Sequence, residues 1–332
     1  MQTKESSYWN RQGSRILCRL CPRECMISEG RYGLCNARQN IDGTLMSQSY
    51  GMISALNLDP VEKKPLYHFY PGSKTLSFGS FGCNLKCGFC QNSGITSSKP
   101  VGNIKLSPED AVYFAVEKNI KLISYTYNEP LINYEWVFDT SMLSRKKSMQ
   151  NILVTNGYVK EEPLKKLACF IDAANVDLKA FGDDFYHRNC GGSLEPVLKS
   201  IEILHKANVH LEITNLVIDG ENSDIEEFEK MVEYIAGIND EMPLHLSRYF
   251  PNHKFTVPKT KRETLFNLYD IAKTKLKYVY LGNFDGIEQE STYCKNCGFC
   301  IISRKGYDIA INCKNPCICQ ECGIRNNIIT EV

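Results

Sequence analysis

The feature that most constrains the fold is a regular alternation of strand-like and helix-like segments between about residues 74 and 290. Strand–helix repetition at this spacing predicts parallel strands joined by right-handed crossovers. Seven segments qualify as strands, which suits an α/β barrel or a large open sheet. They are rich in β-branched and aromatic residues and lie at 75–80, 121–127, 151–158, 172–181, 208–218, 242–250 and 276–282.

Helix signals fall between the predicted strands. Ser107 suits a helix N-cap and Pro108 suits the first helical position. A later segment has Ser223 near its start and repeats apolar residues on one face, as an amphipathic helix does. That face consists of Ile225, Phe228, Met231, Val232 and Ile235.

Chemically capable side chains stand where the predicted strands end. In barrels and open parallel sheets, reactive groups gather at the C-terminal ends of the strands. We therefore expect these side chains to converge on one mouth of the fold. Following the first four strands in order, they are Cys83, Cys87 and Cys90; Asn128 and Glu129; Thr155 and Asn156; and Asp177 and Lys179.

Three cysteines occur within eight residues, in the stretch FGCNLKCGFCQN after the first strand. Three thiolates can hold three irons of a cubane cluster, which leaves the fourth iron without a protein ligand, unlike in an electron-transfer ferredoxin. An open metal position can bind a cofactor or substrate directly. The spacing of Cys83, Cys87 and Cys90 favours this interpretation over a zinc site or a partial ferredoxin motif.

Composition excludes several classes of function. The formal net charge is +1 and the basic clusters at 145–147 and 259–262 suit solvated surface, so we expect no nucleic-acid partner. No apolar run approaches the roughly 20 residues of a membrane span, and the polar N-terminus does not resemble a signal peptide. We therefore expect a cytoplasmic protein with no membrane partner. In a reducing cytosol, 16 cysteines indicate metal binding rather than disulfides.

Two further groups of cysteines lie near the ends of the chain. Near the N-terminus, zinc and an iron–sulfur cluster fit equally well, and the ligands are Cys18, Cys21, Cys25 and Cys35. Near the C-terminus, two Cys-x2-Cys-Gly knuckles have the spacing of a zinc ribbon, with an auxiliary iron–sulfur cluster as the alternative. These ligands are Cys294, Cys297, Cys319 and Cys322, and Cys300, Cys313 and Cys317 are surplus. Cys169 and Cys190 stand apart and are expected to be buried or incidental thiols.

The cysteine motif, with Phe89 before its last cysteine, resembles that of the radical S-adenosylmethionine (SAM) superfamily. The chain is similar along nearly its whole length to the radical SAM enzymes of the AmmeMemoRadiSam system, relatives of the pyruvate formate-lyase activating enzymes. The resemblance rests on CRLCPREC, GRYGLC, DPVEKKPLYHFYPGSKTLSFGSFGCNLKCGFCQN, YTYNEP, LVTNGY, ANVDLKAF and HLSRYFP. It implies a partial (β/α) TIM-like barrel over 51–290, between a Cys-rich segment (1–50) and a zinc-ribbon-like segment (291–332).

The resemblance implies a role for each motif. Cys83, Cys87 and Cys90 would hold a [4Fe-4S] cluster, and SAM would bind its open iron through amino and carboxylate groups. Where the superfamily usually has Gly-Gly-Glu, this chain has Tyr-Asn-Glu-Pro. The resemblance therefore implies that Glu129 and Asn128 contact the SAM amino group. The other implied cofactor-binding residues are Phe89, Thr155, Asn156, Asp177, Lys179, His245, Ser247 and Arg248. Relatives with an arginine for the SAM carboxylate differ from this chain, which has Thr214 or Asn215 there.

Some of these residues have simpler explanations. Glu129 suits a helix N-cap before Pro130. Asp177 and Lys179 suit a mutual ion pair at the barrel rim. His245 suits a satisfied histidine of the barrel interior.

The implied reaction is one-electron cleavage of SAM to methionine and a 5′-deoxyadenosyl radical, which removes a hydrogen atom from a substrate. The relation to activating enzymes implies a protein substrate, and a low-potential electron donor of the flavodoxin or ferredoxin type is the expected partner. Radical modification of a small molecule is the alternative. An electron-transfer or metal-handling protein is a further alternative, which the polar groups at successive strand ends disfavour.

Overall fold

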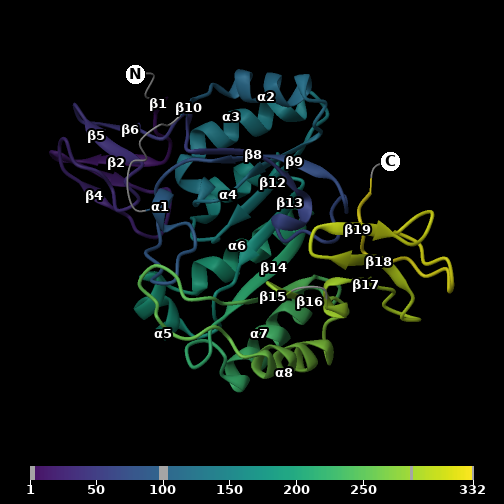
Figure 1. The fold of residues 1–332 in the computed structure, drawn as a ribbon. Helices are drawn as coiled ribbons and strands as arrows, with labels where there is room; N and C mark the ends of the chain where they lie inside the picture. The colour runs from purple at the N-terminus through teal and green to yellow at the C-terminus, as the bar shows by residue number, and fades with distance from the viewer. Residues whose placement is uncertain (1–3, 97–103, 285–286, 331–332) are drawn as a thin grey trace.

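The computed structural model describes residues 4–96, 104–284 and 287–330. Its centre is one eight-stranded sheet in the order β16-β15-β14-β13-β12-β11-β9-β8 (Figure 1). All seven predicted strands are confirmed, and each runs parallel to its neighbours among them. They are β9 (Lys74–Gly79), β11 (Leu122–Tyr125), β12 (Gln150–Thr155), β13 (Ala173–Asp177), β14 (His210–Val217), β15 (Leu244–Arg248) and β16 (Val279–Gly282).

The eighth strand, β8 (Ala55–Pro60), lies outside the sequence prediction and pairs antiparallel with β9. Its segment ALNLDP contains Asn, Asp and Pro, which are depleted in strands and tolerated at sheet edges. Within the described residues, β8 and β16 end the strand order without pairing with each other. The parallel strands therefore form the predicted partial barrel, which is open between these two edges.

Helices of the crossovers cover the outside of this sheet (Figure 1). They are α2 (Pro108–Glu117), α3 (Tyr134–Arg145), α4 (Glu161–Ala168), α6 (Glu195–Lys206), α7 (Ile225–Ile238) and α8 (Arg262–Lys273). The predicted N-cap is confirmed, because the Ser107 hydroxyl accepts a hydrogen bond from the Asp110 N–H at 3.0 Å. In α7 the predicted apolar face is buried except for Ile225, which is exposed because it is the first residue of the helix.

A buried polar network fills the N-terminal end of the strands. The Glu212 carboxylate on β14 accepts hydrogen bonds from the backbone N–H groups of Tyr67 (3.0 Å) and His68 (2.8 Å), which precede β9. It also contacts the Nε2 atoms of His210 (3.1 Å) and His245 (2.6 Å). Although burial opposes ionisation, the two histidines hold the pKa of Glu212 well below its usual range. This network forms the floor of the barrel.

The N-terminal segment builds two small antiparallel sheets at the other end, the mouth of the barrel (Figure 1). One contains β1 (Lys4–Glu5), β6 (Thr44–Ser47) and β5 (Arg38–Ile41); the other contains β2 (Trp9–Gln12), β3 (Arg15–Cys18) and β4 (Met26–Ile27). A buried ion pair fixes this segment to the barrel. Both Glu135 oxygens on α3 lie 2.8 Å from Nη2 of Arg38, and the two side chains are 3% and 1% exposed. A short pair, β7 (Met52–Ile53) with β10 (Ile104–Lys105), adds a further link.

The C-terminal segment closes the floor. Strands β17 (Thr292–Tyr293), β18 (Cys300–Lys305) and β19 (Asp308–Ile311) form an antiparallel sheet on the side of the barrel opposite the N-terminal segment (Figure 1). Arg304 is buried, donates to the Tyr67 carbonyl at 2.7 Å and lies over the Tyr67 ring at 4.3 Å. Ile329 bridges to Phe69. The floor and the C-terminal sheet are therefore one packed unit.

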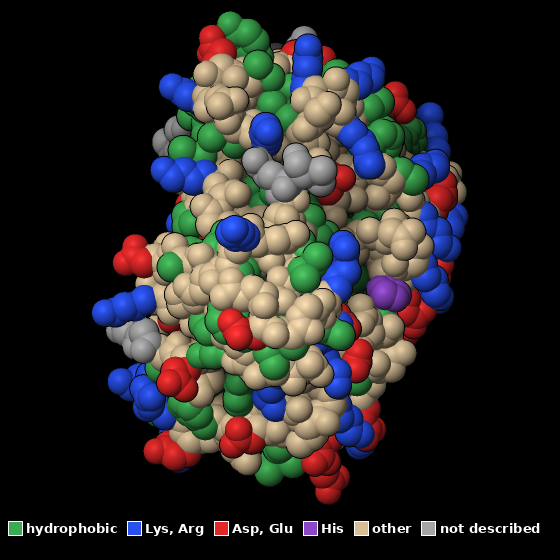
Figure 2. Space-filling view, turned by 90° about the vertical axis from the view of Figure 1, so that its right-hand side faces the viewer, with side chains coloured by type: hydrophobic (Ala, Val, Ile, Leu, Met, Phe, Trp, Pro, Cys, Tyr) green, Lys and Arg blue, Asp and Glu red, His purple; other side chains and the backbone are tan. Residues whose placement is uncertain are grey.

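The molecular surface carries both signs of charge. Figure 2 shows the face with the C-terminal segment, where Lys and Arg side chains are interspersed with Asp and Glu. This pattern agrees with the formal net charge of +1. Among the described helices, none is both long enough and apolar enough to cross a membrane.

Replacing Arg38 with Leu is expected to lower the free energy of unfolding by about 3–5 kcal/mol, because the buried Glu135 carboxylate loses its partner. Denaturant unfolding of the metal-free protein measures this change. The matched control is Arg145→Leu, because the Arg145 side chain is half exposed and its ion pair with Asp172 is 3.9 Å long; this change should cost about 1 kcal/mol or less. Equal losses in the two variants would contradict a fixing role for the Arg38 pair.

Candidate active site

The cysteine loop, residues 81–92, follows β9 at the mouth of the barrel. Its three cysteines are free thiols and partly buried. Asn128, after β11, fixes the start of the loop. Its side-chain oxygen accepts from the Ser80 N–H (2.8 Å), and its NH2 group donates to the carbonyls of Phe81 (3.3 Å) and Gly82 (3.1 Å). These bonds occupy the Asn128 side chain, so it positions the loop rather than pointing freely into the mouth.

The segment 186–192 supports the loop from another side. The carbonyls of Asn189 and Cys190 accept hydrogen bonds from the N–H groups of Gly88 (3.0 Å) and Lys86 (2.8 Å). Cys190 is fully buried, as expected, but it is not incidental. A hydrogen bond that the Cys87 thiol donates to the Cys190 sulfur, and then burial, raise the pKa of Cys87. Because Cys190 lies about 100 residues beyond the motif, its spacing carries no signal of this contact.

The N-terminal segment touches the loop at Gly82. This glycine has a φ of +81°, and a Cβ added there would lie 2.1 Å from the carbonyl oxygen of Cys35. Any other residue would meet both the left-handed backbone penalty and a backbone clash. The glycine therefore allows the N-terminal cysteine segment to pack directly on the cysteine loop.

Glu129 joins the ends of β11 and β12. Its Oε1 accepts from the Thr155 hydroxyl (2.8 Å) and the Leu131 N–H (2.9 Å), and its Oε2 accepts from the Asn156 N–H (2.8 Å). The bond to Leu131 is the predicted N-cap interaction, at the 3₁₀ helix Pro130–Asn133. Burial raises the pKa of Glu129 to about 7, although the three donors oppose the rise. A carboxyl group whose pKa lies near neutral pH can ionise when a cationic ligand binds beside it.

Asn156 connects this carboxyl group to the cysteine loop. Its side-chain NH2 lies 3.6 Å from the Sγ atom of Cys83 and donates to the side-chain oxygen of Asn84 at 3.0 Å. Burial, and then the nearby Glu129 carboxylate, raise the pKa of Cys83. The free thiol is therefore protonated at neutral pH, and a metal must displace its proton to bind.

The predicted ion pair at the rim is present, with Lys179 Nζ 3.0 Å from the Asp177 carboxylate. The same ammonium lies 5.8 Å from the centre of the Phe89 ring. Burial opposes the charge, but the Asp177 carboxylate holds the pKa of Lys179 well above its usual value. A cation therefore lies beside the cysteine loop, where it favours thiolates.

The arrangement fits a metal cluster with one open position and a polar ligand in the mouth. Three free thiols share one loop, and the described part of the chain provides no fourth cysteine within it. Thr214 lies on β14 in register with Asp177 and His245. Its buried hydroxyl has no hydrogen-bond partner among the described residues. Because an unsatisfied buried polar group costs about 1–3 kcal/mol, a polar ligand there would be stabilising.

Three residues implied as cofactor ligands lie on β15 and differ in their surroundings. His245 contacts Glu212 at 2.6 Å in the floor network, as its simpler explanation predicts. Arg248 Nε donates to the Thr260 carbonyl at 2.8 Å, so its guanidinium is partly engaged at the rim. Ser247 is partly exposed on the same strand.

The C-terminal knuckles bring their sulfurs together. The four ligand atoms all lie within 4.8 Å of one another, and the closest pairs are 3.5 and 3.6 Å apart; the residues are Cys294, Cys297, Cys319 and Cys322. Two of the surplus cysteines have other partners. The Cys317 thiol donates to the Ile328 carbonyl at 3.0 Å, and the Cys300 sulfur lies 3.5 Å from the Asn312 amide. The predicted set of four is therefore the one that assembles.

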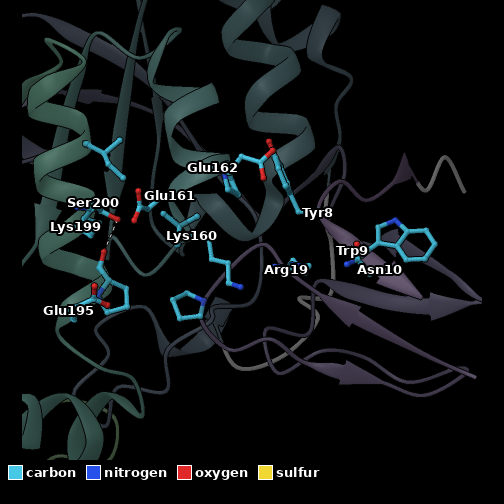
Figure 3. A pocket seen from close by; sticks show the side chains of 15 residues that line it. Tyr8, Trp9, Asn10, Arg19, Lys160, Glu161, Glu162, Glu195, Lys199 and Ser200 are labelled. Atoms are coloured by element: carbon cyan, nitrogen blue, oxygen red, sulfur yellow. Dashed lines mark hydrogen bonds between the residues drawn. The ribbon is translucent and has the colours of Figure 1, made fainter. Parts of the chain in front are cut away.

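A cleft of about 740 Å³ lies away from the cysteine loop (Figure 3). Its walls are β2 of the N-terminal segment and the helices α4 and α6, which contribute Trp9, Glu161 and Lys199 among others. Cys83, Cys87 and Cys90 do not line it. This cleft and the cysteine loop are thus separate features of the protein.

Comparison with known proteins gives a consistent result. The family model described as the Radical SAM superfamily matches residues 78–235. An uncharacterized protein of Methanocaldococcus jannaschii is 40% identical over 326 residues, covering 95% of this chain and 96% of that protein. The 4-hydroxyphenylacetate decarboxylase activating enzyme of Clostridium scatologenes is 24% identical over 115 residues, 34% of this chain and 37% of that protein. The GTP 3′,8-cyclase of Rhodopseudomonas palustris is 24% identical over 216 residues, 59% of this chain and 62% of that protein.

Gly82→Ala is expected to destabilise the protein by about 1–3 kcal/mol and to reduce iron incorporation into the cysteine loop. The reason is the clash of the new Cβ with the Cys35 carbonyl. Thermal unfolding and iron analysis after anaerobic reconstitution measure the two effects. Gly94→Ala is the matched control, because an added Cβ there meets nothing within 4 Å. If both variants match the parent protein, the contact does not shape the loop.

Proposed function

Because this chain belongs to the radical SAM superfamily, we propose that it is an enzyme that cleaves SAM reductively at the mouth of its barrel. A [4Fe-4S] cluster bound there would supply one electron to SAM, which yields methionine and a 5′-deoxyadenosyl radical that removes a hydrogen atom from a substrate. The observation that carries the proposal is the loop of three free thiols after the first parallel strand. Cys83, Cys87 and Cys90 would each hold one iron.

The chain's other side chains would bind and orient rather than react. Glu129 would accept the SAM amino group, since its pKa of about 7 lets it ionise beside a cation. Thr214 offers a hydroxyl without a protein partner among the described residues, in register with Asp177. Lys179 would stabilise the thiolates of the loop, and Arg248, at the rim, would reach the SAM carboxylate. The buried mouth would exclude water from the radical.

A protein is the substrate class that we favour. The similarity to an activating enzyme supports it, because such an enzyme acts on another enzyme. The open side of the barrel between β8 and β16 also supports it, since an incomplete barrel can admit a peptide segment. The similarity to a GTP cyclase favours the alternative, a small-molecule substrate.

Two further components complete the proposal. A low-potential protein of the flavodoxin or ferredoxin type would supply the electron. The C-terminal set of four cysteines would bind zinc, because four thiolates around one ion with Zn–S bonds of about 2.3 Å lie about 3.8 Å apart. The closest pairs there are 3.5 and 3.6 Å apart. Such a closed site would be structural.

The parent protein, reconstituted anaerobically with iron and sulfide and then reduced chemically, is expected to form 5′-deoxyadenosine from SAM. Cys83→Ala should reduce formation to background, because the cluster loses a ligand. Cys169→Ala is the matched control, as this thiol is exposed. Chromatography with mass spectrometry measures the product. Equal product from Cys83→Ala and the parent, or none from cluster-loaded parent with every substrate fraction, would contradict the proposed reaction.

The substrate class can be tested by following the abstracted hydrogen. Cells of the source organism grown in heavy water provide a macromolecular fraction and a small-molecule fraction, separated by gel filtration. If the substrate is a protein, deuterium should appear in 5′-deoxyadenosine only with the macromolecular fraction. Protease treatment of that fraction is the control and should abolish the transfer. Deuterium from the small-molecule fraction alone would establish the alternative.

A further inference from the structure

The four N-terminal cysteines line one small cavity. Its wall includes all four sulfur-bearing residues, Cys18, Cys21, Cys25 and Cys35. The β3–β4 turn brings two of them together, because the Cys18 N–H donates to the Cys25 carbonyl at 3.0 Å. The Leu34 N–H lies 3.5 Å from the Cys25 sulfur. The segment therefore folds into a pocket with four convergent metal ligands.

The spacing of these sulfurs differs from that of the C-terminal set. Of the described residues, only the C-terminal four include three or more potential ligands whose atoms all lie within 4.8 Å of one another. No three of the N-terminal sulfurs are that close, and neither are those of Cys83, Cys87 and Cys90. A single zinc ion requires sulfurs about 3.8 Å apart. An iron–sulfur cluster holds its thiolates farther apart, because each thiolate binds a different iron. The N-terminal set thus resembles the cysteine loop.

The charges around the cavity favour an anionic occupant. Arg23 and Arg38 both line it. Arg38 is neutralised by Glu135. Arg23 donates through Nε to the Asn84 carbonyl at 2.8 Å, and its Nη2 atom is buried with no hydrogen-bond partner among the described residues. Four thiolates around a metal centre carry net negative charge, which this guanidinium would offset.

The cavity lies between the outer cleft and the cysteine loop. On the loop side, Asn84 lines the cavity and directly follows the loop cysteine Cys83 in the chain. On the outer side, the cleft is lined by Arg19 (Figure 3) and Pro22, which are chain neighbours of the N-terminal cysteines. A redox centre here would stand on the path from the surface to the loop.

We propose that Cys18, Cys21, Cys25 and Cys35 bind a second iron–sulfur cluster of the [4Fe-4S] type, which passes electrons to the site at Cys83, Cys87 and Cys90. The relay role rests on the proposed function; the identity of the metal does not. One electron enters from a low-potential donor protein, which is oxidised, and one electron leaves to the loop site. No bond or proton is transferred.

Metal analysis of four reconstituted proteins tests the identity. With four irons per cluster, the parent should hold about eight irons per chain. The loop variant Cys83→Ala, Cys87→Ala, Cys90→Ala should keep about four irons and the low-temperature paramagnetic signal of a reduced cluster. The N-terminal variant Cys21→Ser, Cys25→Ser should also keep about four, and Cys294→Ser, Cys322→Ser should keep all the iron and lose zinc. An N-terminal variant with unchanged iron and one zinc fewer would overturn the proposal.

The loop variant keeps this test decisive even if the N-terminal variant misfolds. Its four N-terminal cysteines are intact, so about four irons per chain after loss of the loop site supports the second cluster. A loop variant without iron, but with native circular dichroism, overturns it. Because this measurement needs no SAM, it separates failure of the second cluster from failure of SAM cleavage.

The relay role predicts a dependence on the electron donor. With a small chemical reductant, the N-terminal variant should form 5′-deoxyadenosine within about twofold of the parent, since the reductant reaches the loop directly. With reduced flavodoxin or ferredoxin as donor, it should fall at least tenfold. An equal loss with both reductants, or no loss with either, would overturn the relay. The exposed-thiol variant Cys169→Ala should match the parent with both.

Discussion

Parallel strands that are joined by outer helices must all end at the same edge of the sheet, and the active-site chemistry depends on this constraint. It brings Asn156 after β12 into hydrogen-bond distance of both Glu129 after β11 and Cys83 in the loop after β9. Most of these polar groups bind each other. The Asn128 amide binds the start of the loop. Glu129 accepts hydrogen bonds from Thr155 and Asn156 at the end of β12 and from the Leu131 N–H in the helix that it caps. The mouth is therefore a rigid frame for a cofactor, with few side chains left to react on their own.

The sequence could predict the parts of the fold that local physics decides. The seven parallel strands are short segments rich in β-branched, aromatic and other apolar residues, and the cap at Ser107 is a local hydrogen bond. The C-terminal set of four cysteines follows from spacing alone. The N-terminal sheets could not be predicted, because their strands have only two to four residues each. Apolar and polar residues hardly alternate along so short a segment. The edge strand β8 could not be predicted for a different reason, since Asn, Asp and Pro give it a loop-like composition.

In the candidate site, too, some features follow from the local sequence and others depend on contacts between distant segments. Residue types at strand ends identify the cysteine loop, Glu129 and the Asp177–Lys179 pair, because topology forces strand ends together. What each side chain does there depends on contacts between distant segments. No pattern in the sequence links Cys190 to Cys87 or the Cys35 carbonyl to Gly82, although these contacts shape the loop. His245 lies on a predicted strand, but only the floor network with Glu212 shows that its ring serves packing.

The two ends of the barrel differ in what a metal would do there. At the floor, Arg304 and Ile329 connect the C-terminal segment to the residues before β9, so a metal bound by the four C-terminal cysteines would stabilise a region remote from the cysteine loop. At the mouth, the N-terminal cysteines pack on the loop itself, and the Arg38–Glu135 pair holds them there against a desolvation cost that exposed ion pairs avoid. Burying this ion pair costs desolvation free energy that attachment of a purely structural N-terminal segment would not require. Its presence is understandable if the distance and orientation between the N-terminal thiols and the cysteine loop must not vary.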